Sequence, residues 1–74
     1  MQRFGEKLRM LREYWELSYR QLAAELDCSH GQLGNIESGL SLPSFELALK
    51  IARYFEVSLD DLMLDERELR LKKR

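Results

Sequence analysis

Two amide side chains, Gln32 and Asn35, are the groups in this chain best suited to molecular recognition. They lie three residues apart, so a helix over this stretch carries both on one outward face. An amide donates and accepts hydrogen bonds together and can match the edge of adenine, where one good bidentate contact is worth about 1–3 kcal/mol. A nucleic acid is therefore the first partner to consider, against the alternative that these side chains form a solvated helix face.

Residue types that support catalysis or metal binding are scarce. Cys28 is the only cysteine and His30 the only histidine, so no internal disulfide can form and the pair alone is too small for a zinc site. Two residues apart at a helix start, the thiol and the imidazole point in different directions and lack a third orienting group. We therefore expect no enzyme, no metal and no cofactor, and a Cys28 that is a small buried hydrophobe.

The elements that position the two amides are two predicted short helices joined by a tight polar turn within residues 17–39. Each helix carries an apolar stripe at three- and four-residue spacing, made by Leu22, Ala23, Leu26, Leu33 and Ile36. Ala23 is small enough to let the two helices cross closely. This layout predicts a helix-turn-helix motif.

Serine residues mark where these two helices begin. Ser18 is followed three residues later by Gln21, which matches a capping box and predicts a helix over about 19–26. Ser29 has a glutamine at the same spacing and predicts a second helix over about 30–38, which a glycine then ends. Two caps in one motif define the register of both helices.

Three further helices complete the predicted fold. The first spans about 3–16, where apolar residues recur at helical spacing: Phe4, Leu8, Leu11 and Trp15. After a loop around Pro43, Ser44 caps a helix with one apolar face: Phe45, Ala48, Ile51, Ala52 and Phe55. Ser58 caps a short fifth helix with its own apolar side: Leu59, Leu62 and Met63. No alternating pattern predicts a strand, so the expected fold class is all-α, a compact five-helix bundle.

Length and charge limit the organisation further. A chain of 74 residues, 45% hydrophobic and 34% charged, suits one small globular domain with little room for an active-site cleft. Residues 1–66 hold seven basic and twelve acidic side chains, a net −5, whereas residues 67–74 hold five basic and one acidic, a net +4. We therefore expect a domain over 1–66 and a basic C-terminal tail over 67–74, which either contacts the DNA backbone or is a solvated end. No signal peptide or membrane segment is found, so we expect a cytoplasmic protein.

Short motifs follow one another along the chain: Leu11-Arg12, Leu17-Ser18, Leu22-Ala23, Ser29, Ile36-Glu37 with Gly39, Pro43-Ser44, and Val57-Ser58-Leu59-Asp60 with Leu62. In this combination the chain from about Phe4 to Leu62 resembles the Cro and phage-repressor type helix-turn-helix domains, also called the xenobiotic response element family. The resemblance implies a lambda-repressor-like DNA-binding bundle, with its third helix in the major groove and its second helix across the DNA backbone.

The resemblance also implies roles for individual residues. His30, Gln32 and Asn35 are implied to read base edges from the third helix. Arg12 and Glu37 are implied to form a structural ion pair that locks the first helix to the third. Three helix ends carry another residue where the family often has glycine, and there the backbone either becomes left-handed or turns differently: Glu16, Asp27 and Glu56.

The expected phosphate contacts are few. Tyr19 stands where the family commonly has a glutamine that approaches a phosphate, and Arg20 is the best further candidate. After the third helix, Ser41 is a candidate where many relatives place lysine or arginine. Gly31 and Gly34 leave two positions of the third helix without side chains. Either they let that helix approach its partner closely, or they carry no function.

Two functions remain open. The first is a small sequence-specific DNA-binding transcription regulator, acting as a homodimer on a two-fold operator. A surplus of apolar residues in the C-terminal third either forms the shared surface, on the fifth helix and tail, or completes the monomer core: Tyr54, Leu59, Met63, Leu64, Leu69 and Leu71. The second is a protein-interaction module on the same fold, such as an antitoxin or an adaptor, which the acidic charge of the domain favours.

Overall fold

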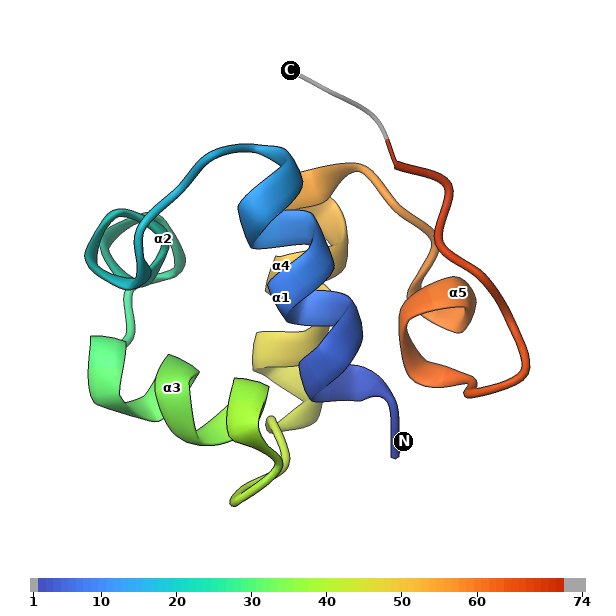
Figure 1. Ribbon diagram of the computed structural model, residues 1–74, viewed down its shortest axis with the longest axis horizontal. Coiled ribbons are helices and arrows are strands. Elements are labelled where there is room, and N and C mark those ends of the chain that lie inside the picture. The colour runs from blue at the N-terminus through green and yellow to red at the C-terminus, as the bar shows by residue number, and fades with distance from the viewer. Residues whose placement is uncertain (1, 72–74) are drawn as a thin grey trace.

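Five α-helices follow one another in the computed structural model, which describes residues 2–71 (Figure 1). They are α1 (Phe4–Tyr14), α2 (Tyr19–Leu26), α3 (His30–Ser38), α4 (Phe45–Phe55) and α5 (Leu59–Met63). No strand occurs in the described part of the chain, so the predicted all-α five-helix bundle is confirmed. No helix within residues 2–71 is long and apolar enough to cross a membrane.

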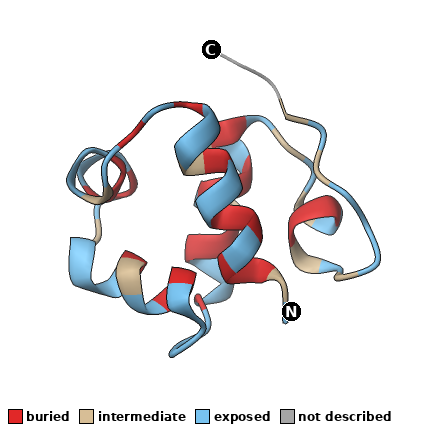
Figure 2. Cartoon of the chain, viewed as in Figure 1, coloured by how far each residue is buried: buried red, intermediate tan, exposed pale blue. Residues whose placement is uncertain are grey.

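The core lies where the helices face one another. α1 stands in the middle of Figure 1, with α2 and α3 on one side and α5 on the other, and the buried residues of these helices face inward (Figure 2). Trp15, which follows α1, packs against the end of α4, with ring centroids 5.5 Å from Tyr54 and 4.9 Å from Phe55. Aromatic contacts of this kind join the first and fourth helices across the core.

Three helix ends use left-handed backbone without a glycine. The φ angles are 58° at Glu16, 57° at Asp27 and 56° at Glu56. Of the two alternatives left open by the sequence, these residues adopt the left-handed one, at a cost of about 1–2 kcal/mol each. α1 is shorter than the predicted 3–16, because its helical turns end at Tyr14 and the chain turns through Glu16.

Gly5 marks the point where α1 crosses the end of α3. A Cβ atom at this position would lie 2.7 Å from the carbonyl oxygen of Glu37 and closer still to that of Ile36. Any side chain would therefore push the two backbones apart. Nothing in the sequence pattern distinguished this glycine from the others, because the contact joins residues about thirty positions apart in the chain.

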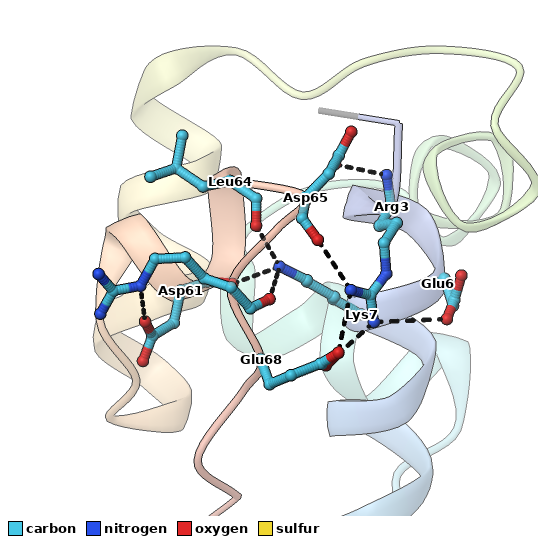
Figure 3. Close-up of polar contacts among 8 residues, drawn as sticks. Arg3, Glu6, Lys7, Asp61, Leu64, Asp65 and Glu68 are labelled. Carbon is cyan, nitrogen blue, oxygen red and sulfur yellow. Dashed lines mark hydrogen bonds and ion pairs between the residues drawn. The ribbon is translucent and has the colours of Figure 1, made fainter.

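A buried lysine ties α1 to the segment that follows α5. Lys7 is 0% exposed, and its Nζ donates hydrogen bonds to the carbonyl oxygens of Asp61 at 2.5 Å, Leu64 at 2.7 Å and Arg67 at 2.7 Å (Figure 3). An ammonium group has three protons to donate, so all three are used. Two of these acceptors, the carbonyls of Asp61 and Leu64, lie at the end of α5, where no further helical turn supplies donors.

A side chain of the same segment, Asp65, binds backbone N–H groups just before the start of α1. Asp65 accepts hydrogen bonds from the backbone N–H groups of Gln2 at 3.0 Å and Arg3 at 2.9 Å, and Arg3 donates two side-chain hydrogen bonds to Glu68 at 3.2 and 3.1 Å (Figure 3). Arg3 supplies no side-chain cap of its own to α1. We call this group the clasp: Arg3, Lys7, Asp61, Asp65 and Glu68.

Several C-terminal residues are part of the folded domain, through the clasp or the core. Glu68 lies in the segment predicted to be a basic tail, yet it is bonded to Arg3 at the start of α1. Most of the apolar surplus also packs against the protein's own core, as the monomer-core alternative expects: Tyr54, Leu59, Met63, Leu69 and Leu71. Leu64 is the exception at 41% exposed. Residues 72–74, which hold the last three cations of the expected tail, lie outside the described residues.

Candidate nucleic-acid interface

The caps of α2 and α3 place the two helices against each other. The Ser18 hydroxyl accepts from the Gln21 N–H at 3.1 Å, and the Gln21 side chain accepts from the Ser18 N–H at 2.8 Å, so this capping box is complete. The Ser29 hydroxyl accepts from the Gln32 N–H at 3.0 Å. Within the described residues the Gln32 side chain makes no return bond to the cap, so its amide is available to a partner.

One face of α3 is open. Leu33 and Ile36 are buried at 0% and 2% exposure, whereas His30, Gln32 and Asn35 are all exposed. A Cβ atom at either glycine of this helix would meet nothing within 4 Å. The outward side of α3 therefore carries exposed amides and two positions without side chains. Its buried residues belong to the core (Figure 2).

A buried ion pair anchors the far end of α3. Arg12 donates to Glu37 through Nε at 2.7 Å and through a terminal amino group at 3.3 Å, and it also donates to the carbonyl of Leu17 at 2.9 Å. The Glu37 side chain is 0% exposed and that of Arg12 is 13% exposed. Glu37 raises the pKa of Arg12 through this hydrogen bond, and breaking a buried pair of this kind costs about 3–5 kcal/mol.

Tyr19 is part of this anchor. Its ring lies beneath the Arg12 guanidinium, 4.3 Å from the ring centroid to the guanidinium carbon, and the residue is partly buried at the start of α2. The ring thus supports Arg12 through a cation–π contact. Only the hydroxyl end of Tyr19 remains for the predicted phosphate contact.

Few cations are left for a nucleic acid once the internal contacts are assigned. Lys7, Arg3 and Arg12 are committed to the clasp and to Glu37. Four exposed cations have no ion pair within residues 2–71: Arg20, Lys50, Arg53 and, after α5, Arg70. Figure 1 shows the last described residues on the side of α5, across the molecule from α3, so the expected tail starts away from this face.

The loop after α3 leaves one polar side chain, that of Ser41, without a role in capping a helix. The N–H groups of Leu40 and Ser41 both point to the Asn35 carbonyl, at 2.9 and 3.3 Å, and the Ser44 hydroxyl accepts from the Leu47 N–H at 3.1 Å. These groups are therefore used in capping α3 and α4. Ser41 is exposed, and its hydroxyl is what remains for a phosphate.

The comparison with known proteins identifies the fold. Residues 3–64 match the protein family described as "Helix-turn-helix domain". The chain belongs to this family. The family expected from the sequence is thereby confirmed.

Relatives and solved structures agree with this assignment. The helix-turn-helix domain is 36% identical over 63 residues to the HTH-type transcriptional activator BcrR of Enterococcus faecalis, covering 85% of this chain and 31% of the relative. It is 37% identical over 60 residues to the uncharacterized HTH-type transcriptional regulator MJ0272 of Methanocaldococcus jannaschii, covering 81% and 91%. The chain thus spans about a third of BcrR and nearly all of MJ0272.

Two solved structures share the fold. The N-terminal DNA binding domain of SinR from Bacillus subtilis superposes with a TM-score of 0.81 at 23% identity, covering 92% of this chain and all of that domain. A transcriptional regulator from Listeria innocua gives a TM-score of 0.76 at 30% identity, covering 80% of this chain and 55% of that one. At 23% identity, the similarity to the SinR domain supports only the arrangement of the helices.

Two sequence expectations about this helix-turn-helix domain are wrong in detail. Phe45 was predicted on the buried face of α4, yet it is 67% exposed, because it is the first residue of α4 and Leu47 takes the buried place. Cys28 is partly buried rather than buried. It packs against the core, and burial raises the pKa of its thiol.

The helix-turn-helix domain also has an apolar surface that the sequence pattern did not predict. Leu40, Leu42 and Phe45 are 79%, 66% and 67% exposed, within one loop and the first residue of α4. The available signal was the segment 39–45, which holds no charged residue in a chain that is 34% charged.

Arg9 is a further candidate site residue that the sequence analysis did not include. It lies three residues before Arg12, so helical spacing already placed both on one face of α1.

Proposed function

We propose that this helix-turn-helix domain is a small sequence-specific DNA-binding transcription regulator. The observation that carries the proposal is the open face of α3, where two exposed amides stand on a helix whose other end is anchored by Glu37. Such a rigid support reduces the ordering cost of binding. The names of both curated relatives, an activator and a regulator of transcription, support the same class.

In the proposed complex, α3 enters the major groove and α2 lies across the backbone. Gln32 and Asn35 contact base edges, with His30 beside them at the start of the helix. Arg20 contacts a phosphate at the start of α2.

Tyr19 and Ser41 complete the proposed phosphate contacts through their hydroxyl groups. Both can donate to a phosphate oxygen, but neither adds charge. The non-specific part of the affinity is therefore small, because it depends on the number of phosphates that cations neutralise. We expect the protein to act in the cytoplasm.

We further propose a homodimer on a two-fold operator. α3 has nine residues and covers only a few base pairs, so two copies about 34 Å apart would supply the rest of the specificity. The proposed shared surface lies at α5, where Leu64 is the exposed apolar residue. Sedimentation with a duplex that carries two half-sites should give two protomers per duplex. One protomer per duplex would contradict the dimer.

The experiment that tests DNA binding is a selection from random duplexes and from native genomic fragments, followed by a salt titration. Enriched sequences should bind with an affinity that falls as salt rises from about 50 to about 200 mM. Asn35→Ala should weaken specific binding by about 1–3 kcal/mol without a change in helical circular dichroism. Gln2→Ala, which removes an amide outside α3, is the matched control. Failure to enrich any duplex would overturn the proposal.

The second candidate is a protein-interaction module, favoured by the exposed apolar surface of Leu40, Leu42 and Phe45. A pocket of about 390 Å³ adjoins this surface and is lined by Gln2, Phe4, Gly5, Ile36, Gly39, Ser41 and Leu42. An uncharged exposed surface of this kind suits a protein more than a phosphate backbone. Capture of a protein by the wild type, lost with Leu42→Lys but kept with Asn35→Ala, would support this function.

A further inference from the structure

Two arginines share one buried carboxylate at the junction of α1, α2 and α3. Glu37 is bonded to Arg12 at 2.7 Å and is also 3.4 Å from the Nε of Arg9. Two guanidinium groups and one carboxylate leave a net charge of +1. The domain over residues 1–66 carries −5, so this is a local reversal of its charge.

The two arginines differ in how far the fold uses them. Arg12 has Glu37, the Leu17 carbonyl and the Tyr19 ring as partners, and its side chain is 13% exposed. Arg9 approaches Glu37 through Nε, and its side chain is 51% exposed. A guanidinium has two terminal amino groups beyond Nε. The uncompensated charge of the cluster therefore sits on Arg9, at the solvent.

Arg9 also lies near both helices of the helix-turn-helix motif. It contacts Glu37 in the last turn of α3. The pKa of Arg9 is raised, chiefly by Glu37 and further by Tyr19 in the first turn of α2. The start of α2 is where the proposed docking brings the DNA backbone close to the protein.

We infer that Arg9 is a further DNA-backbone contact, a positioning residue whose guanidinium binds a phosphate while Glu37 holds its Nε. The inference rests on the proposed function, since it requires the docking of α2 and α3 on a duplex. A phosphate contact from Arg9 carries no sequence information of its own. It would add to the affinity for every duplex and to the salt dependence.

The physical reason for this role is preorganisation. A free arginine side chain loses much rotamer freedom when it binds a phosphate. The contact of Nε with Glu37 removes part of that freedom before the duplex arrives. At 3.4 Å this contact is long for an ion pair, so it leaves the guanidinium free to strengthen its bonds to a second anion.

The test is Arg9→Gln, measured by fluorescence anisotropy with a random-sequence duplex of about 30 base pairs at salt from about 50 to about 200 mM. Loss of one neutralised phosphate should reduce the slope of log affinity against log salt by about 0.9. The factor by which Arg9→Gln weakens binding should therefore be about three-fold greater at about 50 mM salt than at about 200 mM. A merely structural arginine would lower the melting temperature and leave the slope unchanged.

Two further variants complete the test. Arg53→Gln removes one exposed cation beside the end of α2, where Arg53 lines a pocket with Glu25 and Asp27, and it should leave the slope within error of the wild type. Arg9→Lys keeps the charge and should recover most of the slope. Equal slopes for wild type and Arg9→Gln, or a lysine variant that behaves like glutamine, would overturn the inference.

Failure of the proposed function gives a different result. If the wild type binds no duplex at any salt concentration, DNA binding itself is wrong and the role of Arg9 fails with it. If the wild type binds and Arg9→Gln matches Arg53→Gln, only the role of Arg9 fails.

Discussion

The clasp and the outward face of α3 differ in what their polar groups bond to. In the clasp, Lys7 is completely buried and donates to three carbonyl oxygens, and Asp65 accepts from two backbone N–H groups. On α3, the amides of Gln32 and Asn35 are exposed and have no side-chain hydrogen bond within residues 2–71. Polar groups satisfied inside a fold stabilise it, whereas polar groups displayed on a rigid helix are available to a partner.

This comparison also separates two uses of charge. The clasp uses cations to hold the N-terminal and C-terminal segments together, which leaves fewer of them for phosphates. A chain with this charge balance therefore depends on the few cations near α2 and α3 for any long-range attraction to DNA. Changes in the clasp should alter stability, and changes in α3 should alter binding.

The largest expected effect comes from Lys7→Met, which breaks the clasp at its centre. Three carbonyl oxygens lose their donor while the apolar stem is kept, so we expect a loss of about 3–5 kcal/mol in the free energy of unfolding. Urea denaturation measures it. Lys50→Met, at an exposed cation of α4, is the control and should change stability by no more than about 0.5 kcal/mol. Equal losses for both would show that the three bonds contribute little.

Gly5→Ala should have the next largest effect. The added methyl group meets the backbone carbonyls of Ile36 and Glu37, which cannot move away as a side chain could. We expect destabilisation of about 1–3 kcal/mol, read as a lower thermal midpoint. An unchanged midpoint would mean that α1 and α3 separate there at little cost.

Gly34→Ala is the same substitution in the open region, and the expected sign is reversed. A Cβ at Gly34 meets nothing within 4 Å, and alanine favours a helix over glycine by about 1 kcal/mol, so stability should rise by up to that amount. We expect DNA affinity to fall several-fold, because the methyl group holds α3 away from the groove. A more stable variant with unchanged affinity would assign no function to this glycine.

The smallest effect is the pH dependence of the clasp at Asp65. Backbone N–H groups of Arg3 and then Gln2 lower the pKa of this carboxyl below 3.8. A lowered pKa in the folded state gives stability that is present above the unfolded value and lost as pH falls through the folded one. The stability difference between wild type and Asp65→Asn should therefore be present at neutral pH and shrink below about pH 3.8. A difference that is constant with pH would exclude the charge of Asp65 as its source.

Much of the fold was predictable because its signals are local. Ser18, Ser29, Ser44 and Ser58 each cap the helix that follows, and the resulting helix starts agree with the predicted ones. Helical spacing also predicted the buried residues of α2 and α3. A cap acts over three residues and an apolar stripe over one or two turns, so neither depends on distant parts of the chain.

The candidate site was predictable in part. Spacing alone put Gln32 and Asn35 on one face, and both are exposed. The exposure of Phe45 was not predictable, because an apolar residue at a helix start is buried only if another element covers it. The partnership of Arg9 with Glu37 depends in the same way on how α1 meets the end of α3, 28 residues along the chain.

By itself, the sequence determined which segments are helices, where they begin and which faces are apolar, because these properties follow from neighbouring residues. Only the tertiary structure decided that Lys7 is a buried anchor, that Gly5 is a crossing point and that most of the C-terminal apolar residues belong to the core. Lys7 and Asp61 are 54 residues apart, and no short-range rule links them. The outward face of α3 lies between these cases: its amides were evident from spacing, and its open surroundings were evident only once the helices were packed.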